Sequence, residues 1–171
     1  MNNYPSVVVI AEAGVNHNGD FDRAKSLIDA AADIGADIVK FQAFKTENMV
    51  TTTASKAGYQ RNIEGSEVSQ YEMLKNLELS GESHKGLAEY CQIRDIEFMS
   101  TPFDVESAYM LSSLGLPRFK IASGEITNLP LLRAIGSFGR PIFLSSGMSE
   151  LEEVRAAMEV LEVAGTKRSI I

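Results

Sequence analysis

The sequence has one cysteine, Cys91, and no long apolar run among its 171 residues. A single cysteine cannot form an internal disulfide, which is typical of proteins in a reducing compartment. No apolar run approaches the length needed to span a bilayer, and no basic segment precedes an apolar core near the N-terminus as in a signal peptide. We therefore expect a cytoplasmic protein that does not engage a membrane.

Positive charge is also scarce. Lysine and arginine number 16 against 23 aspartates and glutamates, which gives a formal net charge of −7, and no basic run is present. This balance argues against nucleic acid and against an anionic membrane surface as partners. It does not exclude a small anionic substrate, because a few local lysines decide that. The apolar fraction of 44% in a chain of this length is enough for a domain with a core.

Strand-like apolar runs alternate with helix-like periodicity along the chain. The predicted strands are Val7–Ala11, Ile38–Gln42, Ile96–Ser100, Phe119–Ala122 and Pro141–Leu144, with Ser169–Ile171 as the start of a sixth. Each of the five is followed by a helical pattern, so the sequence predicts βα units and a parallel sheet with right-handed crossovers.

Three local features refine this pattern. Asp20 is a plausible N-cap of the first helix, and Ser149 with Glu152 predicts a capping box that opens the last. Residues 43–69 are polar and lack periodicity, which predicts a long loop that is either functional or mobile. Lys45 and His84 lie in polar stretches and are expected to be solvated.

Two architectures fit five βα units: an open doubly wound sheet and part of a (β/α)₈ TIM barrel. No Gly-x-Gly-x-x-Gly follows the first strand, which disfavours a dinucleotide-binding open sheet. Polar residues recur where the strands end, where a barrel places its catalytic groups. The pattern therefore favours a TIM barrel, of which this chain would supply about the first five units, since a full barrel takes ~250 residues.

The stretch Arg118–Glu125 carries a lysine inside an apolar run. If the strand stays extended, Lys120 lies on one face, and Ser123 and Glu125 lie on the other. A bulge at Gly124 would bring all three polar groups to the strand end. Two readings stay open: a solvated edge-strand lysine, or a lysine that binds an anion or forms an imine.

Five segments together resemble, in order, the motifs of the sialic acid synthase family, which includes N-acetylneuraminate, legionaminic acid and spore-coat polysaccharide synthases. They are Ile10–Gly19, Val39–Gln42, Phe98–Phe103, Phe119–Glu125 and Leu144–Met148. The segments span almost the whole chain. The resemblance implies that residues 1–171 form the N-terminal part of a TIM barrel, without its last units and without the small antifreeze-like domain of the family.

The resemblance also implies an activity, the condensation of phosphoenolpyruvate with an N-acyl hexosamine such as N-acetylmannosamine. The product would be a nonulosonic acid, with release of phosphate. The residues that match the family's phosphoenolpyruvate ligands are Lys40, Thr101, Lys120, Ser123 and Ser145. Glu12 matches the catalytic carboxylate, and Gln42 and Glu125 match contacts to the sugar.

Elementary chemistry agrees with these roles. Two lysines on separate strands can neutralise the phosphate and the carboxylate of phosphoenolpyruvate, while hydroxyls complete the hydrogen bonds. A carboxylate such as Glu12 can orient or deprotonate the water that attacks C2.

The family resemblance further implies a divalent ion, Mn²⁺ or Mg²⁺, and a homodimer. The two histidines that hold this metal in the family lie beyond the matched segments, so we expect no metal ligand here. His17, in the first strand-end loop, is a candidate to line the pocket.

Two other functions remain possible from the sequence. A barrel lysine with a depressed pKa can form a Schiff base, so Lys120 could serve an aldolase. The chain could also be a non-catalytic domain that binds a phosphate-bearing ligand or associates through open strand edges.

Overall fold

The structure, a computed structural model, describes residues 7–54, 69–166 and 169–170. Within these residues the strands are β1 (Ile10–Gly14), β2 (Ile38–Ala43), β3 (Glu97–Pro102), β4 (Phe119–Ile121), β5 (Ile142–Leu144) and β6 (Ser169–Ile170). The α-helices are α1 (Phe21–Asp33), α2 (Thr46–Met49), α3 (Gln70–Leu77), α4 (Gly81–Ile93), α5 (Val105–Ser113), α6 (Leu129–Ser137) and α7 (Leu151–Ala164). The predicted alternation of strands and helices is confirmed.

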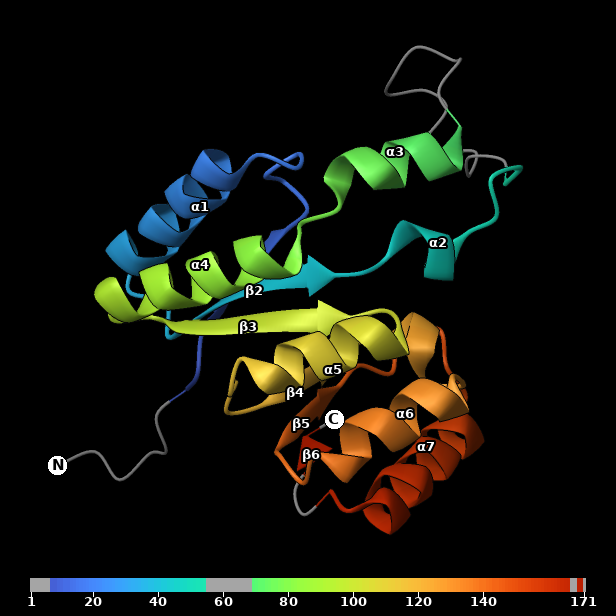
Figure 1. The fold of residues 1–171 in the computed structure, drawn as a ribbon. Helices are drawn as coiled ribbons and strands as arrows, with labels where there is room; N and C mark the ends of the chain where they lie inside the picture. The colour runs from blue at the N-terminus through green and yellow to red at the C-terminus, as the bar shows by residue number, and fades with distance from the viewer. Residues whose placement is uncertain (1–6, 55–68, 167–168, 171) are drawn as a thin grey trace, which may run out of the picture.

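All paired strands run parallel, in two three-stranded sheets of order β1-β2-β3 and β4-β5-β6. β3 and β4 lie next to each other in space, so the second sheet follows the first (Figure 1). An ion pair of 2.8 Å between Arg118 and Glu97 joins the two sheets at the start of β4 and β3. The α/β class with parallel strands is therefore confirmed, and closure into a barrel remains a prediction.

The core lies between the strands and the helices. Helix α1 contacts β1 and β2, and helix α4 contacts β3 (Figure 1). Helix α5 contacts β2 and β3, while α6 and α7 pack against each other. Side chains alternate along a strand, and on β2 the residues Val39, Phe41 and Ala43 belong to the core. The ring of Phe41 stacks on that of Phe98 with 5.6 Å between centroids. The other face of the first sheet carries the polar residues Lys40, Gln42 and Thr101 beside the buried apolar residues Ile38 and Met99.

Side-chain caps begin most of the helices. The predicted cap Asp20 accepts a hydrogen bond from the Arg23 N–H at 2.8 Å. The predicted capping box of Ser149 and Glu152 is wrong by one residue, because the Glu150 N–H donates to Glu153 Oε2 at 2.8 Å. Glu150 and Glu153 thus take the two positions predicted for Ser149 and Glu152. A glutamate in the first turn also interacts favourably with the positive end of the helix dipole.

Three sequence predictions of strand and loop limits are wrong. The first strand begins at Ile10, and Val7 is 83% exposed rather than buried on both faces. The fourth strand ends at Ile121, since Ser123–Glu125 turns as a short 3₁₀ helix. The stretch 43–69 contains helix α2, and its residues 55–68 lie outside the described residues. Among the described residues, no helix is both long enough and apolar enough to cross a bilayer.

Candidate active site

Strand register places four of the predicted site residues on one face of the first sheet. Glu12 is the register partner of Lys40, and Gln42 is the partner of Thr101. Lys40 and Gln42 alternate with Val39, Phe41 and Ala43, which face the helices. Glu12, Lys40, Gln42 and Thr101 therefore share the face opposite the helices, at the carboxyl ends of β1, β2 and β3. We call this region the mouth.

An irregularity in β1 shapes this part of the mouth. The register shifts between Glu12 and Gly14, so Ala13 is an extra residue relative to β2. Gly14 has φ +54°, and a Cβ added there would lie 3.2 Å from Glu12 Oε1 and 3.8 Å from Gln42 Nε2. The bulge thus brings Glu12 and Gln42 to either side of a residue without a side chain, which keeps the space between them open.

Glu12 and Lys40 form an ion pair. The Lys40 side chain is 16% exposed and that of Glu12 is 48% exposed, so the amine is the more enclosed partner. The carboxylate thus lies in direct contact with the amine at the more exposed end of the pair. This pair fits the predicted roles of Glu12 and Lys40, which require them side by side.

The second sheet contributes Lys120 and Ser145. The Lys120 amine donates to the carbonyl oxygen of Ile121 at 2.6 Å. The backbone N–H of Ser145 donates to the same oxygen at 3.1 Å. The shared acceptor places the amine beside the start of the loop after β5. Lys120 alternates with the core residues Phe119 and Ile121, so it also faces away from the helices.

Electrostatic effects connect Lys120 to the first sheet. Burial and the neighbouring charge of Lys40 lower the pKa of Lys120 to about 8, while the carboxylate of Glu12 opposes this change. The three groups are therefore near enough to influence one another, although they belong to β1, β2 and β4. Two amines and a carboxylate at one mouth can bind a doubly anionic small molecule.

Ser123 and Glu125 reach different surroundings. A Cβ added to Gly147 would lie 3.5 Å from Ser123 Oγ, so the ends of β4 and β5 meet at this serine. The Glu125 carboxylate accepts a hydrogen bond from Asn128 Nδ2 at 2.7 Å. Within the described residues no contact joins Glu125 to Gln42. The turn of Ser123–Glu125 replaces the bulge expected at Gly124, and it brings Ser123 rather than Glu125 toward the neighbouring strand end.

Two carboxylates that the sequence analysis did not single out, the half-buried Glu78 and the buried Asp104, hold the segment after β2. Glu78 accepts hydrogen bonds from the backbone N–H and the hydroxyl of Thr46 at 3.1 and 3.0 Å, and from Lys45 Nζ at 3.2 Å. Burial alone would raise the pKa of Glu78, but these bonds and one from Lys75 bring it to about 2. Lys45 is therefore paired rather than freely solvated, contrary to the sequence prediction.

Asp104 is the second of these carboxylates. Its oxygens accept the Lys45 N–H at 2.8 Å and, at the start of α5, the N–H and hydroxyl of Ser107 at 2.8 and 2.7 Å. Asp104 therefore ties the segment after Gln42 to the segment after Thr101. An Asp three residues before a Ser at a helix start is an N-cap signal, which could have revealed Asp104 from the sequence.

Both histidines lie on the helix side of the sheet. His84 is only 1% exposed, contrary to the expectation of a solvated side chain, and its ring nitrogens lie 3.0 Å from Ser80 O and 3.3 Å from Gln42 O. Burial lowers the pKa of His84, although these two carbonyls oppose the effect. His17 is fully buried against Phe41 with 6.1 Å between ring centroids, so it packs on the core face rather than lining the mouth.

The described residues do not fit a metal site. Within residues 7–54, 69–166 and 169–170, no group of three or more His, Cys, Asp or Glu side chains is placed to hold a metal ion. His17 Nδ1 accepts the N–H of Gly19 at 2.9 Å, and both nitrogens of His84 face backbone carbonyls. A divalent ion held by three or more side chains would therefore need at least one ligand from outside the described residues.

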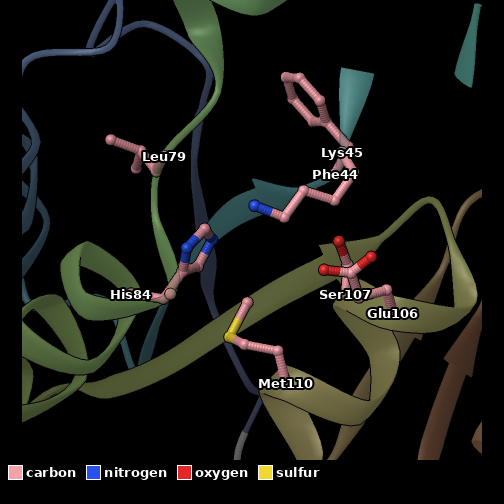
Figure 2. Close-up of a pocket in the computed structure, with 8 residues that line it drawn as sticks. Phe44, Lys45, Leu79, His84, Glu106, Ser107 and Met110 are labelled. Atoms are coloured by element: carbon pink, nitrogen blue, oxygen red, sulfur yellow. The ribbon is translucent and has the colours of Figure 1, made fainter. Parts of the chain in front are cut away.

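A separate pocket of about 200 Å³ lies near His84, between the segment after β2 and helices α4 and α5. Figure 2 shows the Lys45 amine and the His84 ring turned toward each other, with Met110 below them. The pocket is smaller than the ~300–1,000 Å³ of typical ligand sites. His84 packs on the helix-facing Phe98, so this pocket is not part of the mouth.

Comparison with known proteins gives one consistent answer. The NeuB family model matches residues 27–171. The chain is 51% identical to N,N'-diacetyllegionaminic acid synthase of Campylobacter jejuni over 96% of this chain and 49% of that protein. It is 52% identical to the enzyme of that name from Legionella pneumophila over 90% of this chain and 43% of that protein. The chain thus spans about half the length of these curated relatives.

A solved structure gives the same picture. The N-acetylneuraminic acid synthetase of Leptospira borgpetersenii, a crystal structure in complex with citrate, superposes with a TM-score of 0.79 at 31% identity. The match covers 98% of this chain and 56% of that chain. The fold described above is therefore similar to about half of that enzyme.

Proposed function

This chain belongs to the NeuB family of sialic acid synthases, and from that premise we propose that it carries the phosphoenolpyruvate-binding part of a nonulosonic acid synthase. The reaction condenses phosphoenolpyruvate with an N-acyl hexosamine and releases phosphate. The mouth is the first part of a (β/α)₈ barrel whose remaining units lie outside residues 1–171. The observation that carries the proposal is that Lys40 and Lys120, from two sheets, face away from the helices beside Glu12.

Binding follows from the charges at the mouth. Phosphoenolpyruvate has a phosphate and a carboxylate, and each can be neutralised by one of the two amines. Hydroxyls from Thr101, Ser123 and Ser145 would complete the hydrogen bonds to these groups. Side chains on strand ends are held rigidly, which favours the orientation that a two-substrate reaction needs.

The bond changes assign a role to Glu12. C3 of phosphoenolpyruvate attacks the aldehyde carbon of the open-chain sugar, and the aldehyde oxygen gains a proton. A water molecule then attacks C2 and loses a proton, and the resulting intermediate expels phosphate to leave a 2-oxo acid. Glu12 is half exposed at the mouth and paired with Lys40, so we assign it to orient or deprotonate this water.

The acceptor sugar would enter beside Gln42. The gap over Gly14 lies between Gln42 and Glu12, next to the amines that would hold phosphoenolpyruvate. Because relatives at 51% and 52% identity are named for an N,N'-diacetyl product, we propose a hexose with two acetamido groups as the acceptor. Glu125 is a weaker candidate for the sugar site, since its carboxylate is bound to Asn128.

The alternatives from the sequence are less well supported. The relatives are named synthases, which favours condensation over a Schiff-base aldolase. A divalent ion, a homodimer and a cytoplasmic location remain predictions from the family resemblance and the composition. The described residues offer no set of three His, Cys, Asp or Glu ligands, so such an ion would take at least part of its ligand set from elsewhere.

In the direct test, this chain replaces the matching half of the Campylobacter jejuni relative and is fused to that protein's remaining half. We call this fusion the joined protein. The joined protein is assayed with phosphoenolpyruvate and manganese, and with either N-acetylmannosamine or a diacetamido hexose. We expect release of phosphate together with a nonulosonic acid, and a preference for the diacetamido sugar. A folded joined protein that releases no phosphate with either sugar would contradict the proposal and favour a non-catalytic domain.

A further inference from the structure

The two amines of the mouth have different partners. Lys40 is ion-paired with the Glu12 carboxylate. Lys120 forms no ion pair with a carboxylate among residues 7–54 and 69–166, and its hydrogen bond goes to the backbone carbonyl of Ile121 at 2.6 Å. One lysine is thus held as a cation, whereas the other sits partly buried beside that cation.

This arrangement makes Lys120 a nucleophile. A lysine becomes reactive when it is desolvated or placed next to another cation, because both effects favour the neutral amine. Burial and Lys40 act in this direction and lower the pKa of Lys120 to about 8. At pH 7.5 roughly a quarter of such amines are neutral, compared with about one in a thousand for an ordinary lysine.

We propose that Lys120 is a reversible covalent site for 2-oxo acids, which it binds as an imine at the mouth. The neutral amine attacks the carbonyl carbon, both of its protons pass through solvent to the carbonyl oxygen, and that oxygen leaves as water to give the imine. No oxidant or reductant is required. The Lys40 amine on β2 and the Ser145 hydroxyl after β5, the strand paired with β4, would hold the carboxylate of the bound acid.

The ligand class rests on the proposed function, because the condensation product is itself a 2-oxo acid. A product that returns to the mouth would present its ketone to Lys120 and occupy the phosphoenolpyruvate site. The imine would therefore act as covalent product inhibition, separate from the condensation chemistry. Phosphoenolpyruvate has an enol ester in place of the ketone, so it cannot form this bond.

The test uses pyruvate as the probe and the 171-residue chain itself. The chain is incubated with pyruvate and cyanoborohydride at pH 7.5, digested, and analysed by mass spectrometry. We expect a carboxyethyl group on Lys120 that forms at least tenfold faster than on Lys85, an exposed lysine of α4. Lys120→Arg should abolish the adduct, and Lys40→Met should slow its formation at Lys120 while leaving labelling of Lys85 unchanged.

Two results would overturn the proposal: adducts spread over exposed lysines at similar rates, or Lys120→Arg labelled as heavily as the unchanged chain. Circular dichroism of each variant shows that it is folded. The outcome is separable from the proposed function, because condensation by the joined protein together with no pyruvate trapping by the 171-residue chain would refute only the imine. Trapping without condensation would instead support the aldolase alternative.

Discussion

Lys40 and Glu12 are register partners on neighbouring parallel strands, and their side chains form an ion pair on the face opposite the helices. The pair sits next to Lys120, whose pKa is lowered by burial and by the Lys40 charge. Two sheets thus place one paired and one unpaired amine at a single mouth. The proposed binding of phosphoenolpyruvate depends on this arrangement.

Removal of the charge on Glu12 should impair the chemical step. In the joined protein, Glu12→Gln is expected to lower kcat at least a hundredfold, since an amide cannot accept the proton of the attacking water. The KM for phosphoenolpyruvate should change much less, because the Lys40 and Lys120 side chains that would bind it are unchanged. Glu89→Gln, on the exposed side of α4, is the matched control. Near-normal turnover of Glu12→Gln would remove the assignment.

Glu78 should stabilise the segment after β2 in a pH-dependent way. Its folded pKa of about 2 lies below the ordinary value of 4.5, so its contribution is present above pH 4.5 and is lost as the pH falls toward 2. Glu78→Gln is expected to cost about 2 kcal/mol in free energy of unfolding at pH 7. Urea denaturation should show the difference from the unchanged chain shrinking by about 1 kcal/mol at pH 4. If the difference in free energy of unfolding were the same at pH 7 and pH 4, the ionised Glu78 carboxylate would not be its source.

Gly19 should tolerate no side chain. Its φ is +76°, and an added Cβ would overlap the Asn76 carbonyl oxygen at the end of α3. Gly35 has the same φ but open space around its Cα, so it is a matched control for backbone strain alone. We expect Gly35→Ala to cost about 1 kcal/mol, and Gly19→Ala to cost at least about 2 kcal/mol more. Equal losses in denaturant unfolding would show that the loop and α3 do not approach so closely.

His84 should make the fold sensitive to mild acid. Burial lowers its pKa below 6.5, so the unfolded chain takes up the proton first and the free energy of unfolding falls as the pH drops below 6.5. The neighbouring groups are Lys45, His17 and the Ser80 and Gln42 carbonyls. Between pH 7 and 5, His84→Gln should lose less stability than the unchanged chain. If the free energy of unfolding fell equally with pH in the variant and in the unchanged chain, His84 would be accessible to solvent in the folded state.

Much of this architecture could be predicted from the sequence, because local patterns determine it. Apolar runs followed by helical patterns predict the parallel strands, and a polar residue at each strand end predicts the composition of the mouth. The sequence motifs alone single out Glu12, Lys40 and Lys120 as residues of this mouth. The helix start at Asp20 follows from a cap whose chemistry is local.

Other features depend on contacts between distant segments, which local patterns do not contain. His84 looks polar and solvated in the sequence, yet α4 packs it against Phe98 of β3. The carboxylates of Glu78 and Asp104 gain their roles only because the segment after β2 folds back between them. The strand end at Ile121 is likewise set by the 3₁₀ turn of Ser123–Glu125, which a continuous apolar run does not reveal.

The most direct test of whether Lys40 and Lys120 bind phosphoenolpyruvate is isothermal titration calorimetry of this ligand with the joined protein. Saturable binding is expected, and Lys40→Met and Lys120→Met should each weaken it at least tenfold, since each removes one of two cations that face a doubly anionic ligand. Lys85→Met, which removes an exposed lysine far from the mouth in sequence, should leave the affinity unchanged. No binding by a folded protein, or equal losses in all three variants, would contradict the account.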